Sequence, residues 1–431
     1  MMPLPVNAAE FDRLLAPLGP FEPQPKLAVA VSGGADSLAL CLLAHDWARA
    51  GGGAVTALVC DHGLRDGSGQ EAAEVAGRLR ARGMAAQVLR LEIDGATRIA
   101  ERARNARYAA LQAWCAAAGI LHLLVGHHAG DQAETIAMRL LRGSGPDGLA
   151  GMAALVEGRH ARLLRPLLTV APVRLRATLA AFGAAWVEDP TNDDLRYQRA
   201  RVRQLRRDRD GAGPAVTAAC HAATARGERR QRRGREQAGS LAAAVCLHPA
   251  GFALVGPELL TAEALAALVQ TLAGADWPPP LAQVAAWLAA PRAATLGGLQ
   301  VRLAGRLRPG GWLLAREMAA IGAAVAMRPG AVWDRRFRLQ GPVVGECAAL
   351  GAEAAGYRRL SRFPAAILRA LPAIRLGGVV LAVPHLRVGD AAFGALFCPG
   401  MALTQEFWPS RQNPPDAGMH KASWTPILTS A

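Results

Sequence analysis

The feature that most constrains the fold of this chain is the alternation of short apolar runs with helical stretches between residues 26 and 190. Apolar runs with the composition of buried strands cover residues 27–31, 55–60, 87–91 and 121–125. Segments with helical spacing cover residues 37–50, 70–82 and 98–118. This rhythm is typical of βαβ units. We therefore predict an α/β fold, a twisted parallel sheet with helices on both faces, in which ligands bind at the carboxyl ends of the strands.

The first apolar run leads directly into a short polar loop and then into a helix. The loop consists of Ser32, Gly33, Gly34, Ala35, Asp36 and Ser37. Two glycines let the backbone approach an anion closely, and the helix N-terminus offers unpaired N–H groups and the positive end of its dipole. A phosphate would repel Asp36 unless a cation lay between them, which points to Mg²⁺. The loop therefore predicts a nucleotide-phosphate site.

Two other interpretations of this loop exist. A Walker P-loop requires the pattern GxxxxGK[ST], and neither lysine of the chain, Lys26 or Lys421, stands in that context. A P-loop kinase or motor ATPase is therefore excluded. An ordinary Gly-Gly turn capped by serine is the plain structural alternative, which the strand–loop–helix context disfavours.

Further polar motifs follow at defined places along the same region. They are DHGLR at 61–65, RNARY at 104–108, GHHAGDQAET at 126–135, RPLL at 165–168, EDPTN at 188–192 and YQRARVR at 197–203. Residues 143–148 match the dinucleotide pattern GxGxxG, but they follow a helix and not a strand, so we predict a loop there.

The loop at 32–37 resembles the SGGxDS loop of PP-loop ATPases, which split ATP between its α- and β-phosphates. The motifs in this order resemble those of the tRNA(Ile)-lysidine synthetase family, densely over residues 25–205 and more weakly at 332–337 and 376–386. The resemblance implies ATP and Mg²⁺ as cofactors, and as partners free L-lysine and an isoleucine tRNA with a CAU anticodon. The implied product is lysidine, formed when lysine displaces AMP from an adenylated wobble cytidine.

The resemblance also implies residue roles. The loop, with His62 and Arg65, would bind ATP, and Asp36 would bind the metal ion. His127, Arg107 and Arg199 would act at the transferring phosphate or the adenylated base. Asp131 and Glu134 stand about one helical turn apart and would share the ammonium group of lysine. One of these two carboxylates, or a water molecule, would accept its proton.

Several alternatives to these roles stay open. Asp131 and Glu134 also have the D-x-x-E spacing of a helix capping box, and together with His127 and His128 they could suggest a metal cluster. Arg107 and Arg199 could be ordinary surface charges. Two positions depart from the family pattern. Gly130 replaces a frequent acid, and Ala200 replaces a usual asparagine, so the catalytic arginine is open among Arg199, Arg201 and Arg203.

The charge balance indicates a polyanionic partner. Lys+Arg exceed Asp+Glu by 49 − 34 = 15, a surplus that attracts RNA, although an arginine-rich genome could produce the same excess. Basic stretches at 196–209 and 225–236 follow the α/β region. We predict a PP-loop catalytic domain over residues 1–205, a basic, mainly helical tRNA-binding domain over 206–320, and a small α+β tRNA-binding domain over 321–431.

Cysteine spacing and hydropathy limit which kinds of enzyme and which cellular locations remain to be considered for this protein. No two of the seven cysteines have C-x-x-C spacing, so we expect no disulfide framework, zinc site or iron–sulfur site. This disfavours a tRNA 2-thiolase, the main alternative, and no glutaminase motif supports an amidotransferase. The intact loop disfavours a non-enzymatic RNA-binding protein. No signal peptide and no apolar run of roughly 20 residues is present, so we expect a cytoplasmic protein without a membrane partner. The oligomeric state is open, with a homodimer as one option.

Overall fold

The computed structural model describes residues 3–63, 67–91, 99–158, 160–187, 198–205, 213–256 and 260–399. The chain divides into two compact units, Met1–Arg232 and Arg233–Ala431. No helix among the described residues is long and apolar enough to cross a membrane.

A six-stranded sheet forms the centre of the first unit. Its strands are β1 (Lys26–Val31), β2 (Ala54–Asp61), β3 (Ala85–Arg90), β4 (His122–Val125), β5 (Leu155–Glu157) and β6 (Arg162–Leu164). Their order is β3-β2-β1-β4-β6-β5. All neighbours are parallel except the edge pair β5–β6. The predicted fold class, a mostly parallel α/β sheet, is confirmed.

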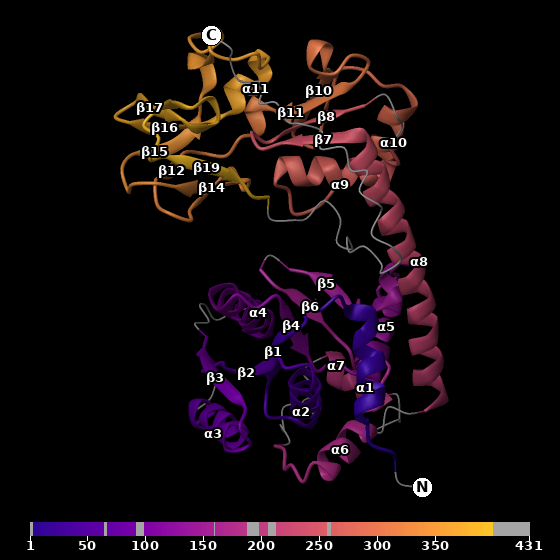
Figure 1. The fold of residues 1–431 in the computed structure, drawn as a ribbon. Helices are drawn as coiled ribbons and strands as arrows, with labels where there is room; N and C mark the ends of the chain where they lie inside the picture. The colour runs from indigo at the N-terminus through magenta and orange to yellow at the C-terminus, as the bar shows by residue number, and fades with distance from the viewer. Residues whose placement is uncertain are drawn as a thin grey trace. The chain divides into compact units, whose positions relative to one another are not determined.

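Helices cover both faces of this sheet, α4 on one side and α2, α3 and α6 on the other (Figure 1). The helices of the first unit are α1 (Ala8–Leu15), α2 (Ala35–Ala50), α3 (Ser68–Ala81), α4 (Ile99–Ala118), α5 (Ala129–Leu141), α6 (Pro172–Ala181) and α7 (Gln198–Leu205). Side chains alternate along β1, because successive residues of a strand point to opposite faces. Leu27 and Val29 join the core under α2, whereas Ala28 joins the core under α4.

A long helix, α8 (Pro214–Ala244), crosses from the first unit into the second. It is followed by β7 (Val245–His248), β8 (Phe252–Val255), α9 (Ala262–Ala273), α10 (Leu281–Ala289), β9 (Ala294–Leu296), β10 (Leu299–Leu303) and β11 (Trp312–Arg316). Strands β10 and β11 form an antiparallel pair. The middle region is helical as predicted, but it also contains a five-stranded sheet of order β7-β8-β11-β10-β9, which the alanine-rich sequence did not reveal.

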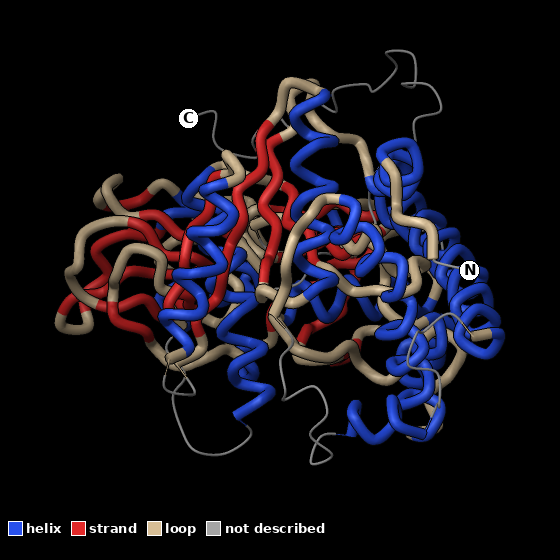
Figure 2. Tube along the Cα trace, turned by 90° about the horizontal axis from the view of Figure 1, so that it is seen from below, coloured by secondary structure: helices blue, strands red, loops and turns tan. Residues whose placement is uncertain are grey.

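Short strands dominate the described residues of the second unit after β11, which end at residue 399. They are β12 (Val325–Ala326), β13 (Val332–Trp333), β14 (Phe337–Gln340), β15 (Glu346–Ala349), β16 (Pro372–Leu376), β17 (Val379–Val383), β18 (Val388–Gly389) and β19 (Gly394–Phe397), with one helix, α11 (Ala365–Ala370). They form a five-stranded sheet, β12-β15-β16-β17-β18, and a three-stranded sheet, β13-β14-β19. Figure 2 shows the strands in red among the blue helices in a view turned by 90°. This small mixed region agrees with the predicted α+β C-terminal part.

Short 3-10 turns link several of these elements. They are η1 (Ala16–Leu18), η2 (Gly148–Ala150), η4 (Gly305–Leu307), η5 (Met318–Ala320), η6 (Gly351–Ala355) and η7 (Pro384–Leu386). The turn η2 belongs to the GxGxxG-like segment, which is a loop, as predicted. Arg139 holds this loop by donating to the carbonyl oxygens of Gly148 and Gly151, both at 2.7 Å.

The VWDRRF motif forms a buried ion-pair cluster in the second unit. The Asp334 side chain is 2% exposed and pairs with Arg336, which is 1% exposed, and with Arg316, which is 11% exposed. Arg336 also donates to the carbonyl oxygens of Gly251 and Leu272. Paired and hydrogen-bonded in this way, the buried charges link the loop before β14 to the β7–β8 turn and to α9.

Candidate active site

Four parallel strands place polar residues at one edge of the sheet. Ser32 follows β1, His62 follows β2, His127 lies just beyond β4, and Arg165 follows β6. Because β1 is parallel to β2 and β4, and β4 is parallel to β6, these carboxyl ends meet at the same rim. The chain leaves β1 toward β2 and returns to β4 on its other side, so the space between β1 and β4 is the switch point where ligands bind in such sheets.

The loop after β1 is closed by its two serines. The Ser32 amide donates to Ser37 Oγ at 3.1 Å, the two hydroxyl groups lie 3.1 Å apart, and Ser37 Oγ donates to the Gly34 carbonyl oxygen at 3.2 Å. Gly33 has a φ of +85°, a left-handed conformation that favours glycine. Gly34 is the N-cap of α2, so the loop opens onto the helix N-terminus. This geometry suits a phosphate group.

Gly126 brings the β4–α5 connection directly against this loop. A Cβ atom at Gly126 would lie 2.9 Å from both the nitrogen and the Cα of Ser37. Only glycine permits so close an approach of two backbone segments. As a result the GHH segment and the phosphate loop are adjacent, although they are about ninety residues apart in the sequence.

His128 lies between two of the predicted site carboxylates. Its Nε2 is 3.5 Å from an oxygen of Asp36 and 3.5 Å from an oxygen of Asp131, and its side chain is 9% exposed. Burial alone would lower the pKa of His128, but Asp131, Asp36 and Glu134 outweigh it, so the pKa lies above its ordinary value. The histidine thus links the phosphate loop to the helix that carries Asp131.

The same histidine corrects the expected capping box. Asp131 and Glu134 were one possible pair, but α5 begins at Ala129 with His128 as its N-cap. The Asp131 amide donates to His128 Nδ1 at 3.3 Å, and the His128 amide donates to the Asp131 carboxylate at 3.1 Å. Histidine is not among the preferred capping residues, so the sequence pattern placed the N-cap at Asp131, about one helical turn after its actual position at His128.

Glu134 has an arginine as its partner. Arg203, on α7, donates from Nε to Glu134 Oε1 at 2.8 Å and from a terminal nitrogen to Oε2 at 3.4 Å. The Glu134 side chain is 1% exposed and that of Arg203 is 35% exposed. This bidentate pair fixes α7 against α5. It was not expected from the sequence, where Glu134 stood as a second carboxylate for lysine.

Among the described residues, three buried polar atoms of the rim have no hydrogen-bond partner. They are His62 Nδ1, Arg107 Nε and the Tyr108 hydroxyl. Burial lowers the pKa of His62, and the nearby Arg107 guanidinium lowers it further, against the opposing charge of Asp61. Buried polar groups normally have partners, so unsatisfied ones at a sheet rim mark a place where a polar ligand fits.

His127 is held by an arginine of another strand end. Arg165 donates from Nε to His127 Nδ1 at 3.3 Å and from a terminal nitrogen to the Ala153 carbonyl oxygen at 2.7 Å. Burial lowers the pKa of Arg165; nearby Tyr108 opposes this effect, although no hydrogen bond of good geometry joins the two residues.

Two predicted site residues fall outside this geometry. Arg65 lies outside the described residues. Arg199 belongs to α7, but its side chain is not described. Of the other two arginines left open by the sequence, Arg201 is exposed and Arg203 is paired with Glu134.

Asp36 is the residue best placed to bind a metal ion. Within the described part of the chain, no group of three or more His, Cys, Asp or Glu side chains could hold a metal on its own. This argues against the metal cluster considered for the GHH segment. Asp36 stands in the first turn of α2, beside the phosphate loop, with its side chain 36% exposed. Mg²⁺ in nucleotide sites commonly uses one or two carboxylates together with phosphate oxygens and water, and Asp36 fits that donor set.

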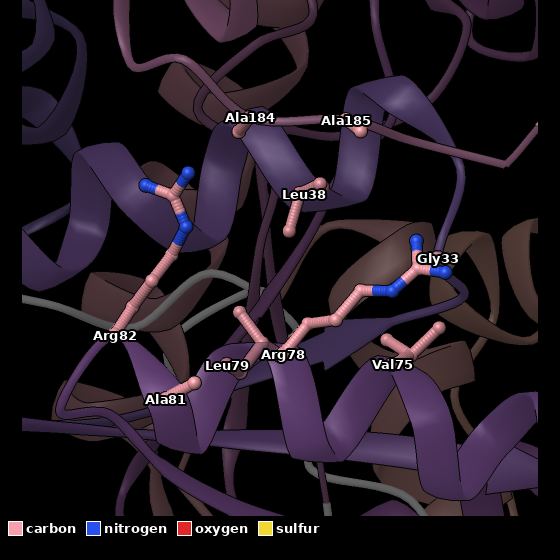
Figure 3. Close-up of a pocket in the computed structure, with 9 residues that line it drawn as sticks. All are labelled: Gly33, Leu38, Val75, Arg78, Leu79, Ala81, Arg82, Ala184 and Ala185. Carbon is pink, nitrogen blue, oxygen red and sulfur yellow. The ribbon is translucent and has the colours of Figure 1, made fainter.

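A pocket of about 420 Å³ lies between α2 and α3 and adjoins the phosphate loop (Figure 3). Its walls are mainly apolar, with Leu38, Val75 and Leu79 among the lining residues. Arg78 extends from α3 toward Gly33 (Figure 3). The wall is close to the loop, because a Cβ atom at Gly33 would lie 2.8 Å from Val75 Cγ2. The pocket therefore backs the phosphate loop, away from the polar rim.

Four residues of the rim were not among the predicted site residues: Tyr108, Gly126, His128 and Arg165. Of these, only His128 had a suggested role, as a metal ligand. Two of them carried a usable signal. Arg165 is a charged residue directly after an apolar strand, and Gly126 is a glycine at a strand end. In a parallel sheet such positions face the ligand edge. The contacts of Tyr108, and the contact of His128 with Asp36, depend on tertiary packing, which local patterns do not encode.

Comparisons with known proteins place the chain in a family. A family model described as a PP-loop domain matches residues 4–207. The tRNA(Ile)-lysidine synthase of Ruegeria pomeroyi is 36% identical over 385 residues, a match that covers 84% of this chain and 89% of that protein. The synthase of Bradyrhizobium sp. strain BTAi1 is 45% identical over 205 residues, 47% of this chain and 56% of that protein.

A third relative gives the same result. The tRNA(Ile)-lysidine synthase of Novosphingobium aromaticivorans is 47% identical over 187 residues, 43% of this chain and 56% of that protein. The chain thus matches little more than half of the Bradyrhizobium and Novosphingobium proteins but nearly the whole of the Ruegeria protein. With a relative matched along almost its full length, and with the PP-loop fold and rim described above, the chain belongs to the tRNA(Ile)-lysidine synthase family.

Proposed function

We propose that this protein uses ATP to attach L-lysine to carbon 2 of the wobble cytidine in the CAU anticodon of an isoleucine tRNA. One observation carries the proposal. His128 bridges Asp36, beside the phosphate loop, and Asp131, on the neighbouring helix, with 3.5 Å to each carboxylate. A phosphate site and an acidic site for an amine therefore adjoin each other, as a ligase that joins a nucleotide-activated base to lysine requires.

In the first step, the cytidine 2-carbonyl oxygen attacks the α-phosphorus of ATP, and pyrophosphate leaves. The residues Ser32, Gly33, Gly34, Ala35 and Ser37, with the N-terminus of α2, bind the departing pyrophosphate through amide and hydroxyl hydrogens. Asp36 holds Mg²⁺, which would neutralise charge on the phosphate oxygens. Support comes from the left-handed Gly33 and from the serine hydrogen bonds that close the loop.

His62, Arg107 and Arg65 bind the nucleotide or the adenylated base beside β2. Support comes from the unsatisfied His62 Nδ1 and Arg107 Nε, which a ligand with both donor and acceptor groups would satisfy. His127 and Arg107 stabilise negative charge that develops at the α-phosphate. Arg199 serves the same anionic centre; its support is the family motif on α7, since Arg203 is already paired and Arg201 is exposed.

In the second step, the ε-amine of lysine attacks carbon 2 of the adenylated cytidine, AMP leaves with the former carbonyl oxygen, and the amine loses a proton. Asp131 receives the lysine ammonium group, because its side chain is 13% exposed and adjoins the phosphate loop through His128. Glu134 lies one helical turn away and adjoins the same site, with its charge largely balanced by Arg203. A charge-assisted hydrogen bond from the lysine ammonium group to Asp131 is favourable there.

The tRNA is bound through arginine-rich surfaces. The stretch 225–236 within α8 contains six arginines, Arg226, Arg229, Arg230, Arg232, Arg233 and Arg235. Arginine contacts phosphates in two directions at once, so such a helix suits the RNA backbone. The three-domain division, with tRNA-binding parts at 206–320 and 321–431, stays part of the proposal. Since tRNA, ATP and lysine all occur in the cytoplasm, this is the compartment that we propose.

The test is mass analysis of the anticodon after incubation of the purified protein with ATP, lysine and the isoleucine tRNA transcript. Lysidine at the wobble position, with equal amounts of AMP and pyrophosphate released, is the expected result. Methionine tRNA, which also has a CAU anticodon, serves as the matched control substrate. A thiolated cytidine, or ATP hydrolysis without base modification, would refute the proposal.

A further inference from the structure

The bond between Arg165 and His127 determines where the imidazole hydrogen lies. A guanidinium group has only donors, so the Arg165 Nε–H must donate and His127 Nδ1 must accept across their 3.3 Å contact. A neutral imidazole has one N–H, and Nδ1 is the acceptor. The ring hydrogen of His127 is therefore on Nε2.

Arg165 is itself firmly held. It is 8% exposed, and one terminal nitrogen donates to the Ala153 carbonyl oxygen at 2.7 Å. Its backbone amide also donates to the Ala154 carbonyl oxygen at 2.7 Å, within the β5–β6 edge of the sheet. The titratable groups around it are Tyr108 and the arginines Arg104 and Arg139. A buried, doubly anchored guanidinium is a rigid reference point for the imidazole ring.

We propose that Arg165 is a positioning residue that fixes His127 as the Nε2–H tautomer, so that His127 donates a hydrogen bond to a phosphorus-bound oxygen of the nucleotide and does not act as a proton acceptor. The substrate half of this inference rests on the proposed function; the tautomer half does not. A ring whose Nε2 already carries its hydrogen cannot take a proton there from cytidine or lysine. Proton removal in the second step therefore belongs to another group.

The tautomer can be measured without any substrate. In the full-length protein with ¹⁵N-labelled histidine, long-range ¹H–¹⁵N spectra distinguish the two tautomers, and His127→Gln identifies the signal. We expect His127 to be the Nε2–H tautomer in the wild type and a mixture in Arg165→Met. An Nδ1–H tautomer in the wild-type protein would overturn the proposal, whether or not the protein forms lysidine.

The donor role is tested by a matched pair of substitutions at position 127. The side-chain amide of His127→Gln can donate a hydrogen from a position close to that of Nε2 but cannot titrate, whereas His127→Ala removes the donor. Loss of one donor to a developing oxyanion costs about 10²–10³ in rate, so we expect that loss in kcat for His127→Ala and a much smaller loss for His127→Gln. Equal losses in the two variants would contradict the donor role.

A double substitution separates positioning from general stability. A residue that orients a ligand-binding side chain typically contributes about 10–100-fold, so Arg165→Met alone should reduce kcat of pyrophosphate release by about that factor. In the His127→Gln background there is no tautomer to fix, and the same change should cost much less. A purely structural arginine would cost the same factor in both backgrounds, which would refute the proposal.

Arg80 provides a matched control. Like Arg165, it donates through Nε and a terminal nitrogen, in this case to the Ala86 carbonyl oxygen at 3.2 and 2.7 Å, but it lies on α3 away from the rim. Arg80→Met should leave both the His127 tautomer and the rate of pyrophosphate release unchanged. If Arg165→Met fails to fold, the wild-type tautomer and the two His127 variants still decide the matter.

Discussion

At the scale of single residues, Asp131 is the position where the charge of lysine would be recognised. Its carboxylate accepts from the His128 amide, a bond that an asparagine oxygen can also make. Asp131→Asn therefore removes the charge and keeps the cap. A hydrogen bond to a charged group contributes about 1.5–3 kcal/mol, so we expect KM for lysine to rise roughly 10–100-fold.

The two half-reactions distinguish this role from general damage to the rim. Pyrophosphate release with ATP and tRNA but without lysine should persist in Asp131→Asn, because the first step does not use lysine. Asp46→Asn, a change of an exposed carboxylate near the other end of α2, is the control and should alter neither step. Loss of both steps together in Asp131→Asn would argue against a lysine site at this position.

Residue identities at the rim could be predicted only where a local pattern carries them. The phosphate loop was predicted from its local motif, and the roles of His127 and Asp131 were implied by the resemblance of their motifs to those of the family. The partner of Glu134 could not be predicted from the sequence, because Arg203 is sixty-nine residues away and only the packing of α7 on α5 brings the two side chains together. The bond from Arg165 to His127 spans thirty-eight residues and two strand ends, and was missed for the same reason.

At the scale of elements, the Glu134–Arg203 pair is what holds α7 beside α5. Removing one partner of a buried pair leaves an uncompensated charge, at a cost of about 3–5 kcal/mol when both partners are buried and less here, since Arg203 is 35% exposed. Arg203→Met should therefore loosen α7 more than the double variant Glu134→Gln/Arg203→Met, in which no charge is left unpaired.

Hydrogen–deuterium exchange of the α7 amides measures this loosening in the full-length protein. We expect faster exchange in Arg203→Met than in the wild type, with partial recovery in the double variant. Arg201→Met changes an exposed arginine on the same helix and is the matched control, with exchange close to wild type. Unchanged exchange in Arg203→Met would show that other contacts hold the helix.

The positions of helices and strands in the first unit could be predicted because the spacing of apolar residues and the polar motifs at the strand ends indicate the same boundaries there. The expected helix at 37–50 is α2, Ala35–Ala50, and the expected strand at 55–60 is β2, Ala54–Asp61. Strands β7 and β8 were not predicted, since their four-residue apolar runs do not differ locally from the alanine-rich helices around them. Their pairing with β11 is a long-range property.

At the scale of the whole molecule, the second unit should be the acid-sensitive one. Burial lowers the pKa of His385 from 6.5 to about 4; the Pro249 carbonyl oxygen opposes this effect, and His248 and Arg336 add to it. The pKa of His385 is lower in the folded protein than in the unfolded chain. Below about pH 6.5, His385 therefore binds a proton in the unfolded chain but stays neutral in the folded protein. Stability contributed by this histidine is complete above that pH and is lost as the pH falls toward about 4.

Calorimetry of the full-length protein at about pH 7 and about pH 5 checks this expectation. The unfolding transition assigned to residues 233–431 should move to lower temperature at the acidic pH, and His385→Gln should reduce that movement. An equal movement in the wild type and in His385→Gln would show that other groups cause the acid sensitivity.

The missing side chain at Gly126 has a consequence for changing the amino acid that the enzyme uses. A single methyl group there would lie 2.9 Å from the nitrogen and Cα of Ser37 and would clash with that backbone, so the contact between residue 126 and the phosphate loop cannot accommodate a side chain. Space for a different amine would have to be made at side chains of α5 and α7. Directed evolution for a new substrate would then have to leave residue 126 as glycine and draw its diversity from those two helices.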